Sequence, residues 1–162
     1  TPDNDTNLWA VNVESGETRE LLASSYSELF ADISPDGRWL AYASSESGRP
    51  EVYVTTFPTP ARRWQVSSDG GSYPRWSRDG EELFFATDAG ELFAAAVNGM
   101  GDTFVVGEIA SLHSWKLASP FRWFYDVSPD GDRVLEVRGL TVDQTDPLHL
   151  VLNWDAELDE NR

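Results

Sequence analysis

The stretch Ser34-Pro35-Asp36-Gly37 decides the fold, because it recurs along the chain in the same setting. It returns as Ser77-Arg78-Asp79-Gly80 and as Ser128-Pro129-Asp130-Gly131, at intervals of roughly 40 to 50 residues, a period typical of repeat proteins. Asp-Gly favours a tight turn, since glycine accepts a positive φ and aspartate can bond to its own backbone two residues on. We therefore predict three equivalent hairpins. Their structural turn residues are Ser34, Asp36, Gly37, Ser77, Asp79, Gly80, Ser128, Asp130 and Gly131.

Short runs rich in aromatic and β-branched residues flank each turn and predict strands. Each run before a turn begins with an aromatic residue and ends with a large apolar one, and the run after it is apolar or alternating. A third strand is expected in each copy, and a fourth is plausible. The expected strands cover 30–33, 73–76 and 124–127, then 38–43, 81–86 and 132–137, then 7–13, 51–57, 91–97 and 148–154, and finally 18–22, 63–67 and 103–109.

The predicted fold class is all-β, with four-stranded antiparallel propeller blades in an incomplete arc of about three to four blades. A β-sandwich of three-strand or four-strand units is the main alternative. We expect a partial blade at 1–24, blades at 25–68 and 69–111, a blade without its own fourth strand at 112–154, and a tail at 155–162. Such an arc has open edges, so we expect either further blades upstream or self-association with another copy.

The pattern around the three turns, followed by a strand such as Glu51-Val52-Tyr53-Val54, resembles the TolB-like, WD-like β-propeller repeat over almost the whole chain. The segment 51–85 is also similar to C-terminal propeller regions of some bacterial serine/threonine kinases. The resemblance implies a bacterial protein with a binding or scaffolding role, in a periplasmic or extracytoplasmic location. It does not identify a ligand, because one fold carries many functions.

Composition excludes several classes of function. The 162 residues carry a net charge of −16, which would repel a phosphate backbone, so we expect no nucleic-acid partner. The absence of cysteine removes disulfides, thiolate nucleophiles and cysteine zinc sites. No apolar run approaches the roughly 20 residues of a membrane helix, so we expect no membrane insertion.

The residues that suggest catalysis are better explained as structure. The Ser-x-Asp-Gly stretches occur in three equivalent copies, whereas a catalytic site needs one unique arrangement. The only histidines are His113 and His149, and the sequence has neither a Gly-x-Ser-x-Gly elbow nor a His-Glu-x-x-His motif. We therefore expect no enzyme activity, no cofactor and no metal site.

Most aromatic residues fall at equivalent strand positions and are expected to pack between blades. They include Trp9, Trp39, Tyr42, Tyr53, Trp76, Phe84, Phe85 and Phe93. The exceptions lie in or beside connections expected to meet on one face, where the scarce positive charge gathers with aromatic rings. We call these residues the loop rim: Tyr26, Arg49, Tyr73, Arg75, His113, Trp115, Lys116, Phe121 and Arg122.

Aromatic residues and arginine are typical hot spots of binding interfaces. The sequence thus favours a non-catalytic propeller segment that binds a protein or peptide through loops on one face. The alternative is an accessory sensor or gating propeller of a larger enzyme, either a bacterial serine/threonine kinase or a prolyl-oligopeptidase-like hydrolase. A third option is a purely structural module of a multidomain exported protein.

Overall fold

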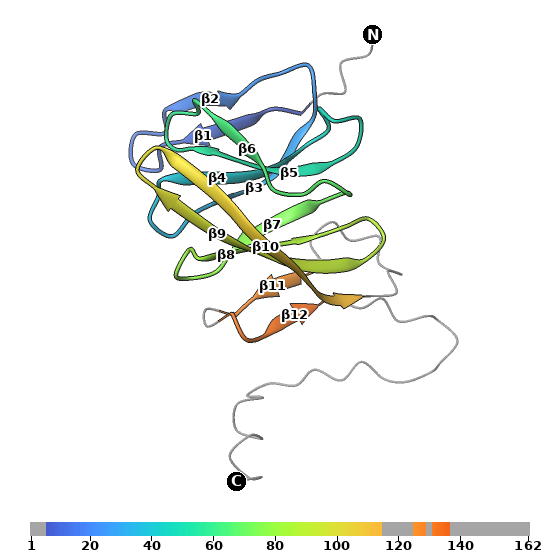
Figure 1. Ribbon diagram of the computed structural model, residues 1–162. Helices are drawn as coiled ribbons and strands as arrows, with labels where there is room; N and C mark the ends of the chain where they lie inside the picture. Colours follow the sequence, from blue (N-terminus) through green and yellow to red (C-terminus); the bar gives the residue numbers. More distant parts are fainter. Residues whose placement is uncertain (1–5, 115–124, 129–130, 137–162) are drawn as a thin grey trace, which may run out of the picture.

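A computed structural model describes residues 6–114, 125–128 and 131–136 (Figure 1). The regular structure of these residues consists of antiparallel strands in four sheets, which confirms the expected all-β class. The sheets follow one another in chain order, from the N-terminal pair to the C-terminal pair (Figure 1). In the described part of the chain no helix is long and apolar enough to cross a membrane.

The two central sheets are complete four-stranded blades with strictly sequential neighbours. The first has the order β3-β4-β5-β6, and the second has the order β7-β8-β9-β10. The strands of the first are β3 (Glu28–Ile33), β4 (Trp39–Ser44), β5 (Glu51–Thr56) and β6 (Arg63–Gln65). Those of the second are β7 (Ser72–Trp76), β8 (Glu82–Ala86), β9 (Glu91–Met100) and β10 (Thr103–Ser114).

Two shorter sheets flank the complete blades. At the N-terminal side β1 (Leu8–Val11) pairs with β2 (Thr18–Leu22), and at the C-terminal side β11 (Tyr125–Val127) pairs with β12 (Val134–Glu136). The first strands of neighbouring sheets are in contact, since β3 touches both β1 and β7. We call β3, β7 and β11 the inner strands. The strand expected at 148–154 and the tail at 155–162 lie outside the described residues.

The hairpin turns share one hydrogen-bond pattern. The Ser34 hydroxyl donates to Asp36 Oδ1 at 2.6 Å and accepts from the Trp39 N–H at 2.9 Å. The Ser77 hydroxyl donates to Asp79 Oδ1 at 2.7 Å and accepts from the Glu82 N–H at 2.9 Å. Each of these two buried serines therefore closes its hairpin from the inside.

The described residues of the third turn form the same hydrogen bonds as their counterparts in the first two turns. The Ser128 hydroxyl accepts from the Arg133 N–H at 3.0 Å, and the Gly131 N–H donates to the Ser128 carbonyl at 2.9 Å. Gly131 has a φ of 76°, as does Gly80, and this conformation is strained for residues with a side chain. Asp130 lies outside the described residues.

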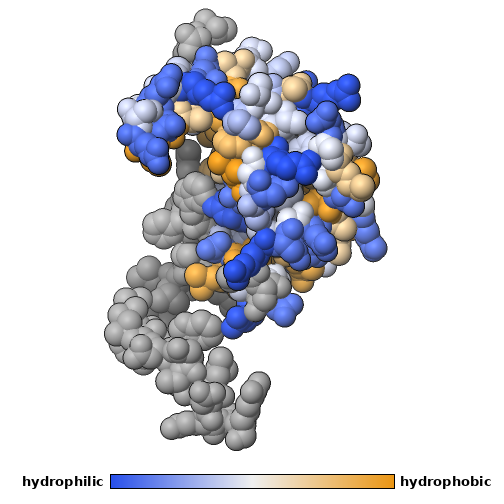
Figure 2. All heavy atoms as spheres, turned by 90° about the vertical axis from the view of Figure 1, so that its left-hand side faces the viewer, coloured by the Kyte–Doolittle hydropathy of each residue, from blue (hydrophilic) through white to orange (hydrophobic). Residues whose placement is uncertain are grey.

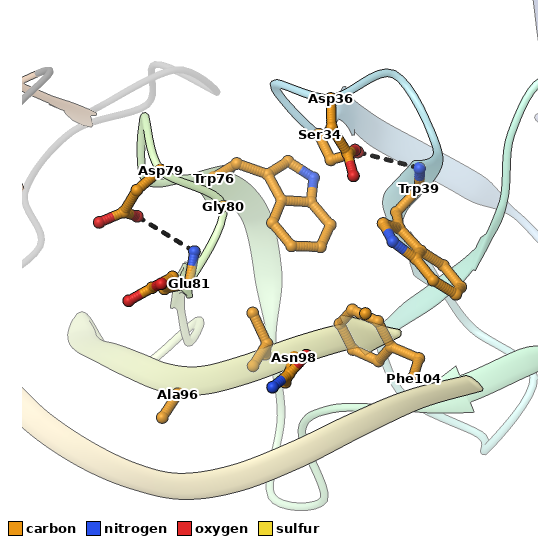
Figure 3. A pocket seen from close by; sticks show the side chains of 12 residues that line it. Ser34, Asp36, Trp39, Trp76, Asp79, Gly80, Glu81, Ala96, Asn98 and Phe104 are labelled. Atoms are coloured by element: carbon orange, nitrogen blue, oxygen red, sulfur yellow. Dashed lines mark hydrogen bonds between the residues drawn. The ribbon is translucent and has the colours of Figure 1, made fainter. Parts of the chain in front are cut away.

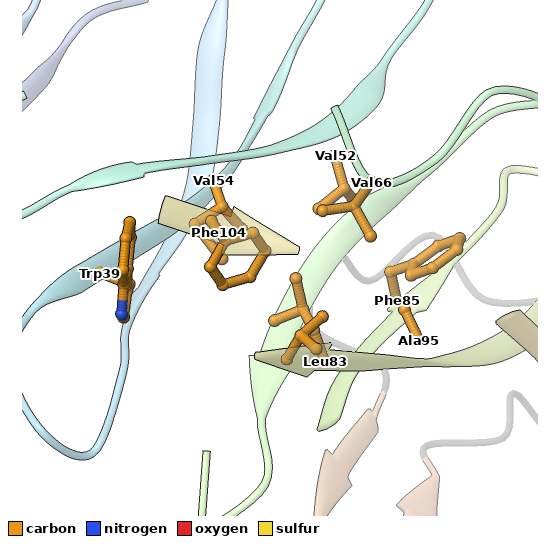
Figure 4. Close-up of a cluster of buried hydrophobic side chains, with 10 residues drawn as sticks. Trp39, Val52, Val54, Val66, Leu83, Phe85, Ala95 and Phe104 are labelled. Atoms are coloured by element: carbon orange, nitrogen blue, oxygen red, sulfur yellow. The ribbon is translucent and has the colours of Figure 1, made fainter. Parts of the chain in front are cut away.

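The core lies between the two complete blades, which pack face to face. Leu83 and Phe85 of β8 point into this layer, because alternate residues of a strand share a face. Figure 4 shows them opposite Val52 and Val54 of β5, with Phe104 of β10 beside them. The full set of buried residues is Trp39, Ala41, Val52, Val54, Val66, Leu83, Phe85, Ala95, Val97 and Phe104.

The other face of the second blade is buried as well. Phe84 and Ala86, which alternate with Leu83 and Phe85 along β8, pack with Leu92 and with Tyr125 of β11. A sheet buried on both faces needs a neighbour on each side, which is the packing of a propeller blade.

Three expectations differ from the structure. Trp9 is 58% exposed, because within the described ranges too few residues pack over its two-stranded sheet to cover it. The fourth strand of the second blade does not end near residue 109 but continues as β10 to Ser114, since β9 supplies paired residues as far as Glu91. His113 therefore lies on a strand opposite Leu92 and not in a connecting loop.

The serine hydroxyls of the turns should matter for stability. Ser77→Ala would leave the Glu82 N–H without its acceptor and remove one bond to Asp79, so we expect a loss of about 1–3 kcal/mol of unfolding free energy. Urea unfolding followed by tryptophan fluorescence measures the loss. The exposed Ser25→Ala is the control and should change stability little. Equal effects of the two variants would contradict the role assigned to the turn hydroxyl.

Candidate functional site

The structure brings two residues of the predicted loop rim together and separates others from them. Tyr73 and Arg75 both lie on the inner strand β7. His113 lies on β10, at the opposite edge of the same sheet. Tyr26 is exposed, in the connection between β2 and β3. Outside the described residues are Trp115, Lys116, Phe121 and Arg122.

Arg49 is held within its own blade. Its Nε donates to Glu51 Oε1 at 2.8 Å, and its Nη1 lies 2.9 Å from Asp69 Oδ1. A third bond runs from its Nη2 to the Ser68 carbonyl at 2.5 Å. The side chain thus joins the connection before β5 to the connection after β6. Its bonds to Glu51 and Asp69 also raise the pKa of the Arg49 guanidinium.

The inner strands share a backbone irregularity at an aromatic residue. Phe30 in β3 has a φ of 55° and Tyr73 in β7 has a φ of 57°, a conformation uncommon for residues with a side chain. The strand register shifts at both places. The two rings meet across the blades with their centroids 4.1 Å apart. Such bulges redirect side chains and are frequent beside functional sites.

Two residues after each aromatic position the inner strands carry a charge. These residues are Asp32 in β3, Arg75 in β7 and Asp126 in β11. Asp32 accepts a hydrogen bond from the Trp76 N–H at 3.0 Å, and its carbonyl accepts one from Trp76 Nε1 at 3.2 Å. The two bonds attach the first complete blade to the second along the inner strands.

The charges of Arg75 and Asp126 both act on Asp32. Burial raises the pKa of Asp32 above its usual range, and the charge of Asp126 raises it further. The Trp76 N–H and the charge of Arg75 oppose this shift without cancelling it. The inner strands thus present an acid, a base and an acid in succession, which suits a ligand that carries charged groups of both signs.

Tyr125 joins this group from the third inner strand. Its hydroxyl donates a hydrogen bond to the Tyr73 carbonyl, at the irregular residue of β7. Burial raises the pKa of the Tyr125 hydroxyl well above its usual range, so the group is a neutral donor. We use the name inner-strand cluster for Phe30, Asp32, Tyr73, Arg75, Tyr125 and Asp126.

Sequence reasoning placed Tyr73 and Arg75 in this region but missed Phe30, Asp32, Tyr125 and Asp126. The signal was present, since Asp32, Arg75 and Asp126 hold the same position in the three aligned copies and alternate in charge. In the described ranges no group of three His, Asp or Glu side chains is placed to hold a metal ion.

Comparison with known proteins supports the fold. No family model matches the sequence, and no curated protein matches it. A solved structure assigned as TolB from Agrobacterium tumefaciens is similar, with a TM-score of 0.55 and 19% identity. The match covers 82% of this chain and 51% of that protein, so the chain spans about half of its length. The described structure therefore has a TolB-like propeller fold, formed as an incomplete propeller.

The bond between Asp32 and Trp76 can be tested with a matched pair of variants. Asp32→Ala leaves the Trp76 N–H without its acceptor and should cost about 1–3 kcal/mol of unfolding free energy. Asp32→Asn keeps an acceptor oxygen and replaces a carboxyl group whose pKa is raised by burial. A carboxyl group whose pKa is higher in the folded than in the unfolded chain favours folding only at low pH. The free energy of unfolding therefore falls as the pH rises and the carboxyl group ionises. The Asn variant should therefore be more stable to unfolding than the wild type near neutral pH. This difference in stability should vanish below pH 3.8, the ordinary pKa of the carboxyl group.

Thermal and urea unfolding at several pH values measures both variants. An Asn variant that loses as much stability as the Ala variant at neutral pH would contradict this account of Asp32.

Proposed function

We propose that the chain is a non-catalytic propeller segment that binds a protein or peptide through the inner-strand cluster and the loops beside it. The observation that carries the proposal is the succession of Asp32, Arg75 and Asp126 on three neighbouring inner strands, next to bulged aromatic residues. Peptides offer both charge signs, apolar side chains and backbone groups, which match such a surface. The resemblance to TolB adds support at the level of the fold only.

The same features would serve an accessory propeller of a larger enzyme, such as a kinase or a hydrolase. Its partner would then be another domain of the same protein or that enzyme's substrate. The upstream sequence of the gene distinguishes the two proposals, since a kinase or hydrolase motif there would favour the enzyme.

Binding can be tested by selecting peptides from a displayed random library on the 162-residue chain. The dissociation constant of a selected peptide is then measured for each variant. Arg75→Glu should weaken binding about tenfold or more, because it reverses the central charge of the cluster. Trp115→Ala, in the predicted loop rim, should weaken it as well. Arg78→Glu is the matched control, because Arg78 is exposed in the turn after β7.

Circular dichroism would show that the variants are folded. Unchanged dissociation constants for both Arg75→Glu and Trp115→Ala would overturn the placement of the binding face.

We further infer that a second copy of the chain pairs with the open N-terminal sheet. The β1–β2 sheet has two described strands where the complete blades have four, and Trp9 and Val11 on β1 are each 58% exposed. An exposed apolar edge of this kind is a template for pairing with another strand.

Light scattering at micromolar concentration should give twice the 18.1 kDa mass of one chain. Val11→Lys places a charge on the edge strand and should shift the mass toward a monomer. Val13→Lys is the control, because Val13 lies beyond the strand and is 94% exposed. A stable wild-type monomer under these conditions would reject self-association.

A further inference from the structure

A pocket opens between the two complete blades at the end that carries the turns. Its volume is about 440 Å³, and none of its lining residues belongs to the inner-strand cluster. One wall is the turn from Ser34 to Trp39, and the opposite wall is Trp76 with the turn that contains Asp79 and Glu81 (Figure 3). The residues 96–99 of β9 and Phe104 of β10 complete it. Figure 2 looks onto this end, where hydrophobic patches show between mostly hydrophilic side chains.

Aromatic rings form much of the pocket and are held in place. The ring of Phe104 lies 5.1 Å from that of Trp39 and 6.0 Å, edge to face, from that of Trp76, measured between centroids. Trp76 is fixed further by the bond from its Nε1 to the Asp32 carbonyl. The pocket therefore offers preformed aromatic surface that a ligand need not order.

Carboxylates surround these rings. Asp79 uses Oδ1 for the turn, where it accepts from the Ser77 hydroxyl and the Glu81 N–H, and both bonds lower its pKa. Its Oδ2 takes no part in those turn bonds. Glu81 lines the same wall, and Asp36 lies across from it. In a chain with a net charge of −16 these groups attract cations.

The charge of Asp36 is partly balanced by a residue of this chain. Arg38 Nη1 lies 3.8 Å from Asp36 Oδ2, and Arg38 Nη2 donates to the Gly101 carbonyl at 2.6 Å. The Arg38 guanidinium also lies over the Trp39 ring, 5.6 Å from its centroid. Arg38 shows that a guanidinium can contact both an aromatic ring and a carboxylate at this end of the blades. Asp79 and Glu81 are not part of these Arg38 contacts and can pair with a second cation.

A buried donor supplies an independent sign of a ligand. Trp39 is 3% exposed, and its Nε1 has no hydrogen-bond partner in the described part of the chain. Figure 3 shows this nitrogen on the ring edge that faces the pocket. Gly99 makes the arrangement possible, because a β-carbon there would lie 2.2 Å from Nε1. An unpaired buried donor costs free energy that an acceptor on a ligand would recover.

We propose that this pocket binds an arginine side chain presented by a partner peptide. The guanidinium pairs with Asp79 and Glu81 and stacks on Trp76, for which its planar shape and donors are suited. Trp39 Nε1 is buried against Gly99, so a carbonyl of the peptide backbone accepts from it only when the Gly99 backbone moves aside. A neutral sugar would satisfy the donor and the rings but would gain nothing from the negative charge, so the charges favour arginine.

The proposal is tested by titrating the ¹⁵N-labelled 162-residue chain with the peptide acetyl-Gly-Arg-Gly-amide. The Trp39 indole resonance, assigned by its loss in Trp39→Phe, should shift in a saturable manner. The same peptide with citrulline in place of arginine is the neutral control, and its affinity should be lower by about five-fold or more. Maltose serves as the sugar probe and should leave the resonance unchanged.

Two variants that preserve shape test the carboxylates. Asp79→Asn and Glu81→Gln should each weaken the arginine peptide about five-fold, and Asp79→Asn retains an acceptor oxygen for the turn. Asp88→Asn is the matched control, because Asp88 is exposed outside this pocket. Absence of a shift with the arginine peptide, equal binding of the citrulline peptide, a saturable shift with maltose, or unchanged affinity in both variants would each overturn the proposal.

Discussion

A serine hydroxyl in each turn holds the first two strands of its blade in register. In the Ser77 turn the hydroxyl joins the Asp79 carboxylate to the backbone N–H of Glu82, so both ends of the hairpin close on one oxygen. Register matters because a slip of one residue moves every side chain of a strand to the other face. In β8 such a slip would exchange Leu83 and Phe85 with Phe84 and Ala86, which fill two different layers of the core.

The packing between blades depends on this register. With both faces of the second blade buried, its inner strand is fixed against β3 on one side, where Trp76 donates two hydrogen bonds to Asp32. On the other side the Tyr125 hydroxyl reaches the Tyr73 carbonyl. Asp32 thus both attaches two blades to each other and contributes to the row of charges on the inner strands. A substitution in the inner-strand cluster can alter both stability and binding, and its effects on the two have to be measured separately.

The sequence was sufficient to predict the turns, the strands that follow them and the four-stranded blades, because those features depend on local chemistry and on period. It was not sufficient for features decided by contacts between blades. The bulges at Phe30 and Tyr73 accompany a ring contact across two blades, and no local pattern in either strand signals them. Trp9 is an aromatic residue at a strand position and was expected to be packed, but it is exposed. Its burial depends on whether a neighbouring sheet covers it, which the local sequence does not show. The loop rim was predicted in and beside loops, whereas all six residues of the inner-strand cluster lie on strands.

The residue that follows the charged position after each turn shows where repeat structure ends and specific chemistry begins. Trp39, Glu82 and Arg133 occupy this position in the three copies, so the hairpin does not require an aromatic residue there. A phenylalanine at position 39 could also pack against Phe104, and it has no N–H that would be left unpaired in the core. Burying the unpaired indole N–H therefore costs about 1–3 kcal/mol of stability. Neither the turn nor the packing of the core requires this N–H. That cost is offset if the N–H has an acceptor in the protein's working state, and the pocket in front of it is the place from which one can arrive.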